Sequence, residues 1–152
     1  MGRSPSTVDL TIRNAKVYVS GTLIEGGIAV EDGRIVRIAK NANLPRACRE
    51  IRLRDGQILI PGPIDVHVHL RDQGLAYKED FVSGTMAAAA GGITLVIDMP
   101  NNEPVTMDPA GLRERMRRAR GRILVDVAFY SAFPGRIAVS YTHLTLPTTE
   151  RV

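Results

Sequence analysis

The feature that most constrains the fold is a nearly continuous apolar run, ITLVID, at residues 93–98. A strand with one face in water alternates apolar and polar residues, whereas a strand covered on both faces does not. The run ILVDVAFY at residues 123–130 is of the same kind, and IDVHV at residues 64–68 is a third strand candidate. The sequence therefore predicts strands of a parallel sheet that is buried between helices.

Two helical stretches separate these strands. The first covers about residues 78–90, opens near the acidic residues at 79 and 80, and is stopped by the glycines at 91 and 92. The second, AGLRERMRRAR, follows Asp108, which can cap a helix, and Pro109, which suits a first helical turn. The order β-α-β-α-β predicts the α/β class.

Residues 8–60 have a different pattern, with short alternating runs separated by turn residues. Asp32-Gly33 lies between two such runs, and Asp-Gly is a strong hairpin signal because both residues tolerate positive φ. Asp55-Gly56 repeats the arrangement in the run EIRLRDGQILI. We expect these residues to form a small antiparallel β unit.

Composition excludes several classes of protein. Cys48 is the only cysteine, so an intramolecular disulfide is impossible, which fits a reducing, cytoplasmic location. No apolar run approaches the roughly 20 residues of a membrane span. The net charge is +4. A basic cluster lies in the second helical stretch, and because no aromatic residues interleave with it we interpret it as the solvated face of a helix and expect no nucleic-acid partner. Its arginines are at positions 113, 115, 117, 118, 120 and 122.

Two of the three histidines, His67 and His69, stand two residues apart where a strand meets a loop. Strand residues with this spacing point to the same side, so the two imidazoles should project together while Val66 and Val68 enter the core. Both could then bind a metal at about 2.0–2.1 Å. The alternative is a pair of core histidines bonded to the backbone. Asp65 is either a partner that orients a histidine or a plain strand-end carboxylate.

Four motifs in order carry a resemblance to a known family: HVHLR, KEDFVSGT, AAAAGGIT and MPNN. With them, residues 8–134 resemble the beginning of dihydroorotases, in the cyclic amidohydrolase branch of the amidohydrolase superfamily. The resemblance implies a metal-dependent (β/α)₈ barrel beside a small β-sandwich. Residues 8–60 would be N-terminal sandwich strands, and residues 61–138 would hold barrel strands one to three.

The resemblance also implies roles for single residues. His67 and His69 would bind a catalytic zinc, and the complete site would hold one or two zinc ions. His69, Arg71 and Asn101 would contact the substrate. Arginine's planar fork suits the carboxylate of dihydroorotate. Simpler readings stay open, because Arg71 could be a surface loop residue and Asn101 could set a turn. The resemblance places the other zinc ligands and the general base outside these residues, so we expect no catalytic residue in this chain and no activity from it alone.

The implied activity is the reversible cyclisation of N-carbamoyl-L-aspartate to dihydroorotate in de novo pyrimidine synthesis. The alternatives are an allantoinase, a hydantoinase or dihydropyrimidinase, or a non-catalytic structural relative of these. Arg71 disfavours the neutral rings of the first two groups, and retention of both histidines argues against the third. The expected partner is a small-molecule substrate, without nucleic acid or membrane, and the resemblance allows a homo-oligomer.

The two ends of the chain do not follow this pattern. We interpret residues 1–7 as a disordered leader. VSYTHLTLPT, within residues 139–152, is the translation of a common sequencing adapter, so we interpret that segment as a tail that is not native. His143 is therefore not expected to be a ligand.

Overall fold

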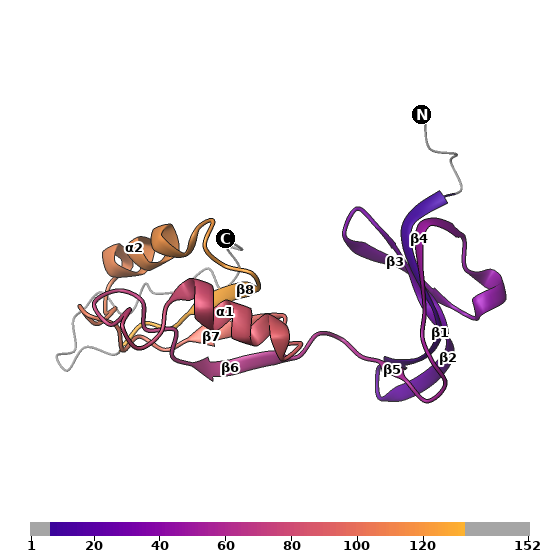
Figure 1. Ribbon diagram of the computed structural model, residues 1–152, viewed down its shortest axis with the longest axis horizontal. Helices are drawn as coiled ribbons and strands as arrows, with labels where there is room; N and C mark the ends of the chain where they lie inside the picture. The colour runs from indigo at the N-terminus through magenta and orange to yellow at the C-terminus, as the bar shows by residue number, and fades with distance from the viewer. Residues whose placement is uncertain (1–6, 133–152) are drawn as a thin grey trace, which may run out of the picture. The chain divides into compact units, whose positions relative to one another are not determined.

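The computed structural model describes residues 7–132, which divide into two compact units after Pro61 (Figure 1). The first unit is built from strands, and the second alternates strands and helices. The proposed tail at residues 139–152 and most of the proposed leader lie outside the described residues. Thr7, which we assigned to the leader, is the first residue of a strand.

A long strand, β1 (Thr7–Val19), organises the first unit. One of its edges begins an antiparallel meander, in which β1 pairs with β2 and β2 pairs with β3. Its other edge pairs in parallel with β4 and then with β5. The remaining elements are β2 (Thr22–Glu31), β3 (Arg34–Ala39), a short 3₁₀ helix η1 (Asn41–Asn43), β4 (Arg46–Arg52) and β5 (Ile58–Leu59).

The prediction of an all-antiparallel unit is therefore wrong in part. Asp32 and Gly33 have φ angles of 48° and 71° and form the expected hairpin turn between β2 and β3. Asp55-Gly56 is not a hairpin turn, because the strands on either side of it both run parallel to β1. β1 also has a bulge after Ile12, where Asn14 has a φ of 57°. β4 pairs with β1 before the bulge and β5 pairs with it after the bulge.

The second unit confirms the predicted α/β order. Its three strands form a parallel sheet in the order β6-β7-β8, and one helix follows each of the first two strands. A single apolar cluster joins the helices to the sheet, with Leu70, Phe81, Val96, Ala119 and Val127 at its centre. The elements are β6 (Ile64–Val68), α1 (Phe81–Ala90), β7 (Leu95–Asp98), α2 (Pro109–Ala119) and β8 (Asp126–Phe129).

The helix ends follow the sequence signals closely. The Asp108 side chain accepts a hydrogen bond from the Gly111 amide at 2.7 Å, and Pro109 begins α2 as predicted. Asp80 caps α1 by accepting from the Ser83 amide at 2.8 Å, and hydrogen bonds from Ser83 lower the pKa of Asp80. Helix α1 ends before two glycines, of which Gly92 has the left-handed φ of 79°.

The burial of the strands differs from the prediction at β6. Val68 packs against the core cluster, but Val66 is 58% exposed, so its predicted place in the core is wrong. The apolar cluster reaches only the carboxyl end of β6. In β7, Val96 and Asp98 are buried, whereas the alternate residues Leu95 and Ile97 are half-buried. Within residues 7–132, neither helix is long and apolar enough to cross a membrane.

Candidate functional site at the carboxyl end of β6

A bulge in β6 shapes the candidate site. Asp65 pairs with Val96 and Val68 pairs with Asp98, so β6 has one more residue than β7 between these two pairs. The His67 amide donates to the Asp65 carboxylate at 3.1 Å. Asp65 therefore contacts the backbone of a histidine in the bulge, a contact that the sequence reading did not include. Bulges commonly redirect side chains beside functional sites.

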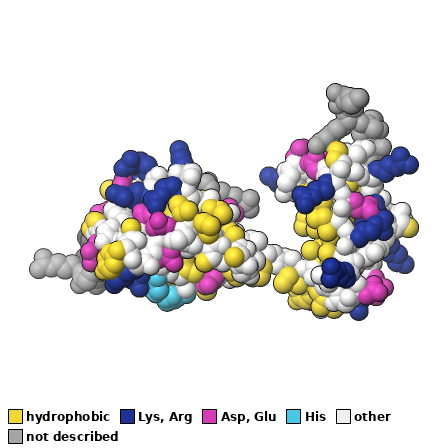
Figure 2. Space-filling view, viewed as in Figure 1, with side chains coloured by type: hydrophobic (Ala, Val, Ile, Leu, Met, Phe, Trp, Pro, Cys, Tyr) yellow, Lys and Arg dark blue, Asp and Glu magenta, His cyan; other side chains and the backbone are white. Residues whose placement is uncertain are grey.

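The two histidines do project together. Their ring centroids lie 5.2 Å apart with an interplanar angle of 80°, and both residues are exposed. Figure 2 shows the described histidine side chains as one surface patch on the second unit. The alternative of two core histidines bonded to the backbone is therefore wrong, because neither residue is buried.

Asn101, in the loop after β7, completes this group. Its Oδ1 lies 3.1 Å from His69 Nδ1. Because a carbonyl oxygen only accepts, this contact favours the tautomer with the proton on Nδ1, which leaves Nε2 the lone pair that metal binding requires. The next residue, Asn102, has a different role: it is buried, donates to the Pro104 carbonyl at 2.7 Å and accepts from the Thr106 hydroxyl at 2.9 Å.

The turn that follows His69 has an unusual backbone. Arg71 and Asp72 have φ angles of 55° and 45°, a left-handed conformation that costs residues other than glycine roughly 1–2 kcal/mol each. Asp72 is buried and forms an ion pair with Arg122 at 2.8 Å, and its amide donates to the Glu79 carbonyl at 3.0 Å. Arg71 is half-buried and stands two residues after His69 in the sequence.

A buried ion pair lies behind this turn. Asp98, the last residue of β7, pairs with Arg115 of α2, and both residues are 1% exposed. Asp98 also accepts from the Leu70 amide at 2.8 Å, and Arg115 donates to the Arg71 carbonyl at 2.8 Å. The Arg115 guanidinium also lies 5.0 Å from the centre of the Phe81 ring, and burial lowers its pKa to about 10.

Arg115 corrects our reading of the basic cluster. Arg117 and Arg118 are solvent-accessible and pair with Glu114, as expected for a solvated face, but Arg115 is buried. The missed signal is periodicity, because residue 115 belongs to the inward stripe of α2 with Leu112, Met116 and Ala119. Asp98, a carboxylate at the end of a buried strand, was also not identified from the sequence.

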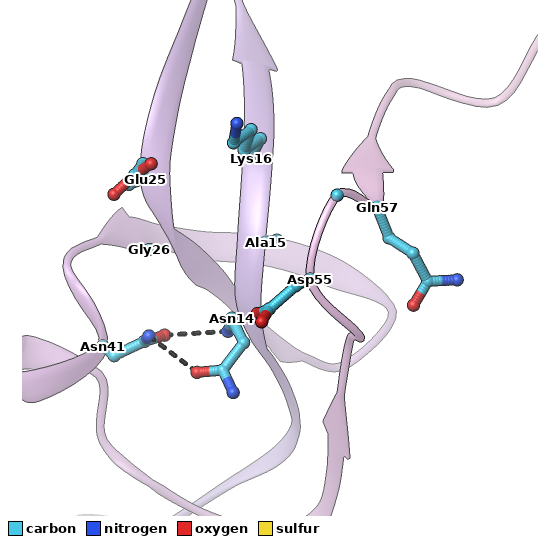
Figure 3. A pocket seen from close by; sticks show the side chains of 9 residues that line it. Asn14, Ala15, Lys16, Glu25, Gly26, Asn41, Asp55 and Gln57 are labelled. Carbon is cyan, nitrogen blue, oxygen red and sulfur yellow. Dashed lines mark hydrogen bonds between the residues drawn. The ribbon is translucent and has the colours of Figure 1, made fainter.

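One open pocket lies in the first unit, and no histidine lines it. It has a volume of about 330 Å³ and a mainly polar lining (Figure 3). Asn14 and Asn41, two of its lining residues, are joined by hydrogen bonds of 3.1 and 2.9 Å. Since Asn14 forms the β1 bulge, this pocket is explained by the local backbone.

The structure therefore brings His67, His69 and Asn101 together and places Arg71 in the adjoining turn. Within residues 7–132 there is no group of three or more His, Cys, Asp or Glu side chains that could hold a metal ion. These features define an α/β protein with an imidazole-containing site at the carboxyl ends of parallel strands, which is where enzymes of this class place their reacting groups.

Comparison with known proteins identifies the family. The model of the amidohydrolase family matches residues 58–138, and the chain belongs to this family. It is 36% identical over 129 residues to a dihydroorotase from Methanosarcina acetivorans, covering 85% of this chain and 27% of that protein. It is 42% identical over 123 residues to an allantoinase from Arabidopsis thaliana, covering 78% of this chain and 24% of that protein.

A solved structure supports the same relationship. The L-hydantoinase (dihydropyrimidinase) from Arthrobacter aurescens matches with a TM-score of 0.76 and 32% identity, covering 82% of this chain and 28% of that one. The chain thus spans about a quarter of the length of these relatives.

Proposed function

We propose that these residues belong to a dihydroorotase, which interconverts N-carbamoyl-L-aspartate and dihydroorotate in de novo pyrimidine synthesis. The observation that carries the proposal is the group formed by His67, His69 and Asn101, with Arg71 in the left-handed turn that begins two residues after His69. Both substrates have a carboxylate, which the arginine fork can bind through two hydrogen bonds. Several relatives at 36–43% identity are also dihydroorotases.

The metal in this proposal is zinc, bound by His67 and His69. The donor set fits, since two imidazoles share one face and the His69–Asn101 contact leaves Nε2 of His69 available. A bound zinc would lower the pKa of a water molecule and polarise the ring carbonyl. In the same reaction Arg71 would hold the substrate carboxylate. Asn101 would keep the His69 ring in one tautomer, and both Asn101 and His69 would contact the substrate.

The proposal extends to the fold. We infer that β6, β7 and β8 are the first three strands of a (β/α)₈ barrel and that residues 8–60 contribute strands to a β-sandwich. Two observations support this: the parallel order β6-β7-β8 with one helix between successive strands, and the likeness to the hydantoinase structure.

The test is a comparison of three substrates. The complete gene product containing these residues, whatever its length, is assayed with dihydroorotate, allantoin and hydantoin at equal concentrations. We expect dihydroorotate to be hydrolysed with the highest kcat/KM. A preference for allantoin or hydantoin would contradict the role of Arg71, and absence of turnover with zinc-loaded protein would favour a non-catalytic relative.

A further inference from the structure

We infer that Arg115, through its ion pair with Asp98, is a positioning residue that holds the turn carrying Arg71 in its substrate-binding conformation. The inference rests on the proposed function, in which Arg71 binds the carboxylate. It adds a residue from α2 that does not itself reach the histidine face.

The first observation is that the turn at Arg71 and Asp72 has a backbone conformation that other contacts must stabilise. Arg71 and Asp72 both have left-handed backbone angles, 55° and 45°, although neither is glycine. Residues in this region persist only where the surrounding structure imposes it, and such residues cluster at functional sites. The conformation of Arg71 is thus determined by its contacts and not by its own preference.

The second observation is that one ion pair supplies contacts on both sides of the peptide bond joining Leu70 to Arg71. The Leu70 amide donates to Asp98 Oδ1 at 2.8 Å, and the Arg71 carbonyl accepts from Arg115 Nη1 at 2.8 Å. Asp98 and Arg115 are bonded to each other through Asp98 Oδ2 and Arg115 Nη2. Strand β7 and helix α2 therefore both define where the backbone of Arg71 lies.

The third observation is that Arg115 occupies a position where stability alone would favour an apolar residue. The guanidinium is buried beside Phe81 and Phe129, 5.0 and 5.6 Å from their ring centres. A buried ion pair commonly contributes no more stability than apolar residues of the same volume, because both charges lose their hydration. What an apolar side chain at 115 could not provide is the hydrogen bond to the Arg71 carbonyl.

The experiment is a double-mutant cycle in the complete gene product, with Arg71→Met, Arg115→Met and both together. Each single variant should raise KM for dihydroorotate about tenfold or more, because a charged hydrogen bond is lost or misplaced, while kcat changes much less. The double variant should have the same KM as Arg71→Met alone, since Arg115 acts only through Arg71. Arg117→Met is the control, because Arg117 lies on the same helix with a side chain that is 75% exposed.

The outcomes separate the two ideas. If Arg71→Met leaves KM unchanged, the carboxylate role fails and the inference fails with it. If Arg71→Met raises KM and the KM effect of Arg115→Met multiplies with it in the double variant, Arg115 is merely structural and the inference alone is overturned. Should Arg115→Met not fold, the cycle is repeated with Arg115→Lys, which keeps the charge but lacks the fork that reaches both partners; the same non-additive KM is expected.

Discussion

His69 shows how one side chain acquires a defined chemical state from its neighbour. The Asn101 oxygen at 3.1 Å selects the tautomer protonated on Nδ1, so that Nε2 faces away with its lone pair. Substituting Asn101 with leucine removes this acceptor without adding charge. We expect zinc affinity to fall about tenfold or more, as is usual when the partner of a metal-binding histidine is lost. Competition with a chelating dye measures the affinity, and an unchanged value would show that Asn101 does not orient the ring.

The histidine pair itself gives a stronger prediction. Replacing both His67 and His69 with alanine should abolish hydrolysis and remove zinc from this site, because both proposed imidazole donors are lost. Elemental analysis of the purified complete gene product measures the stoichiometry. Cys48→Ala is the control, since Cys48 is exposed and lies in the other unit. Normal zinc content in the double variant would refute the ligand assignment.

At the scale of single elements, helix α1 depends on the capping residue that precedes it, Asp80. Asp80 accepts from the Ser83 amide at 2.8 Å, and the Ser83 hydroxyl contacts the Asp80 amide in return. We expect Asp80→Ala to destabilise the second unit by about 1 kcal/mol, whereas Asp80→Asn should retain most of the cap. Denaturant unfolding with helix-specific hydrogen exchange would measure both, and equal losses in the two variants would argue against capping.

The same residue predicts a pH dependence. Hydrogen bonds from Ser83 lower the folded-state pKa of Asp80 below its ordinary value of 3.8. A lowered carboxyl pKa stabilises the folded state above the unfolded pKa, and this contribution is lost as pH falls through the folded pKa. The advantage of Asp80 over Asp80→Asn should thus be complete at neutral pH and disappear in acid below pH 3.8. An advantage that persists unchanged in strong acid would contradict this origin.

At the scale of the whole molecule, the unpaired strand edges of the second unit determine whether the chain associates with itself. Strands β6 and β8 each pair with β7 alone among the described strands, and Ile64 and Val66 of β6 are each 58% exposed. Unpaired edges with apolar side chains promote association between chains. We expect the 152-residue chain, expressed alone, to associate with rising concentration and to show no dihydroorotate turnover. Val66→Lys should reduce the association measured by light scattering.

Two results would contradict this expectation. One is a chain that stays monomeric, unfolds cooperatively and hydrolyses dihydroorotate. The other is a Val66→Lys variant that is much less stable than the original chain, since a residue that is 58% exposed has little packing to lose.

Local patterns were sufficient to predict much of this molecule. The apolar runs that follow each of the two helical stretches predicted β7 and β8, Asp108 with Pro109 predicted the start of α2, and Asp32-Gly33 predicted a hairpin. These signals are local because a strand's burial, a helix cap and a tight turn depend on residues close in sequence. The spacing of His67 and His69 likewise predicted that their side chains would meet.

Only the tertiary structure decided the rest. The parallel pairing of β4 and β5 with β1 joins segments that are distant in sequence, and the exposure of Val66 depends on how far the core cluster extends. The contacts of Asp98 with Arg115 join residues 17 positions apart, and those of Arg115 with Arg71 join residues 44 apart. A sequence pattern read over a few residues does not specify such pairings, because they form only when strand, turn and helix pack together and leave a buried charge with one partner in reach.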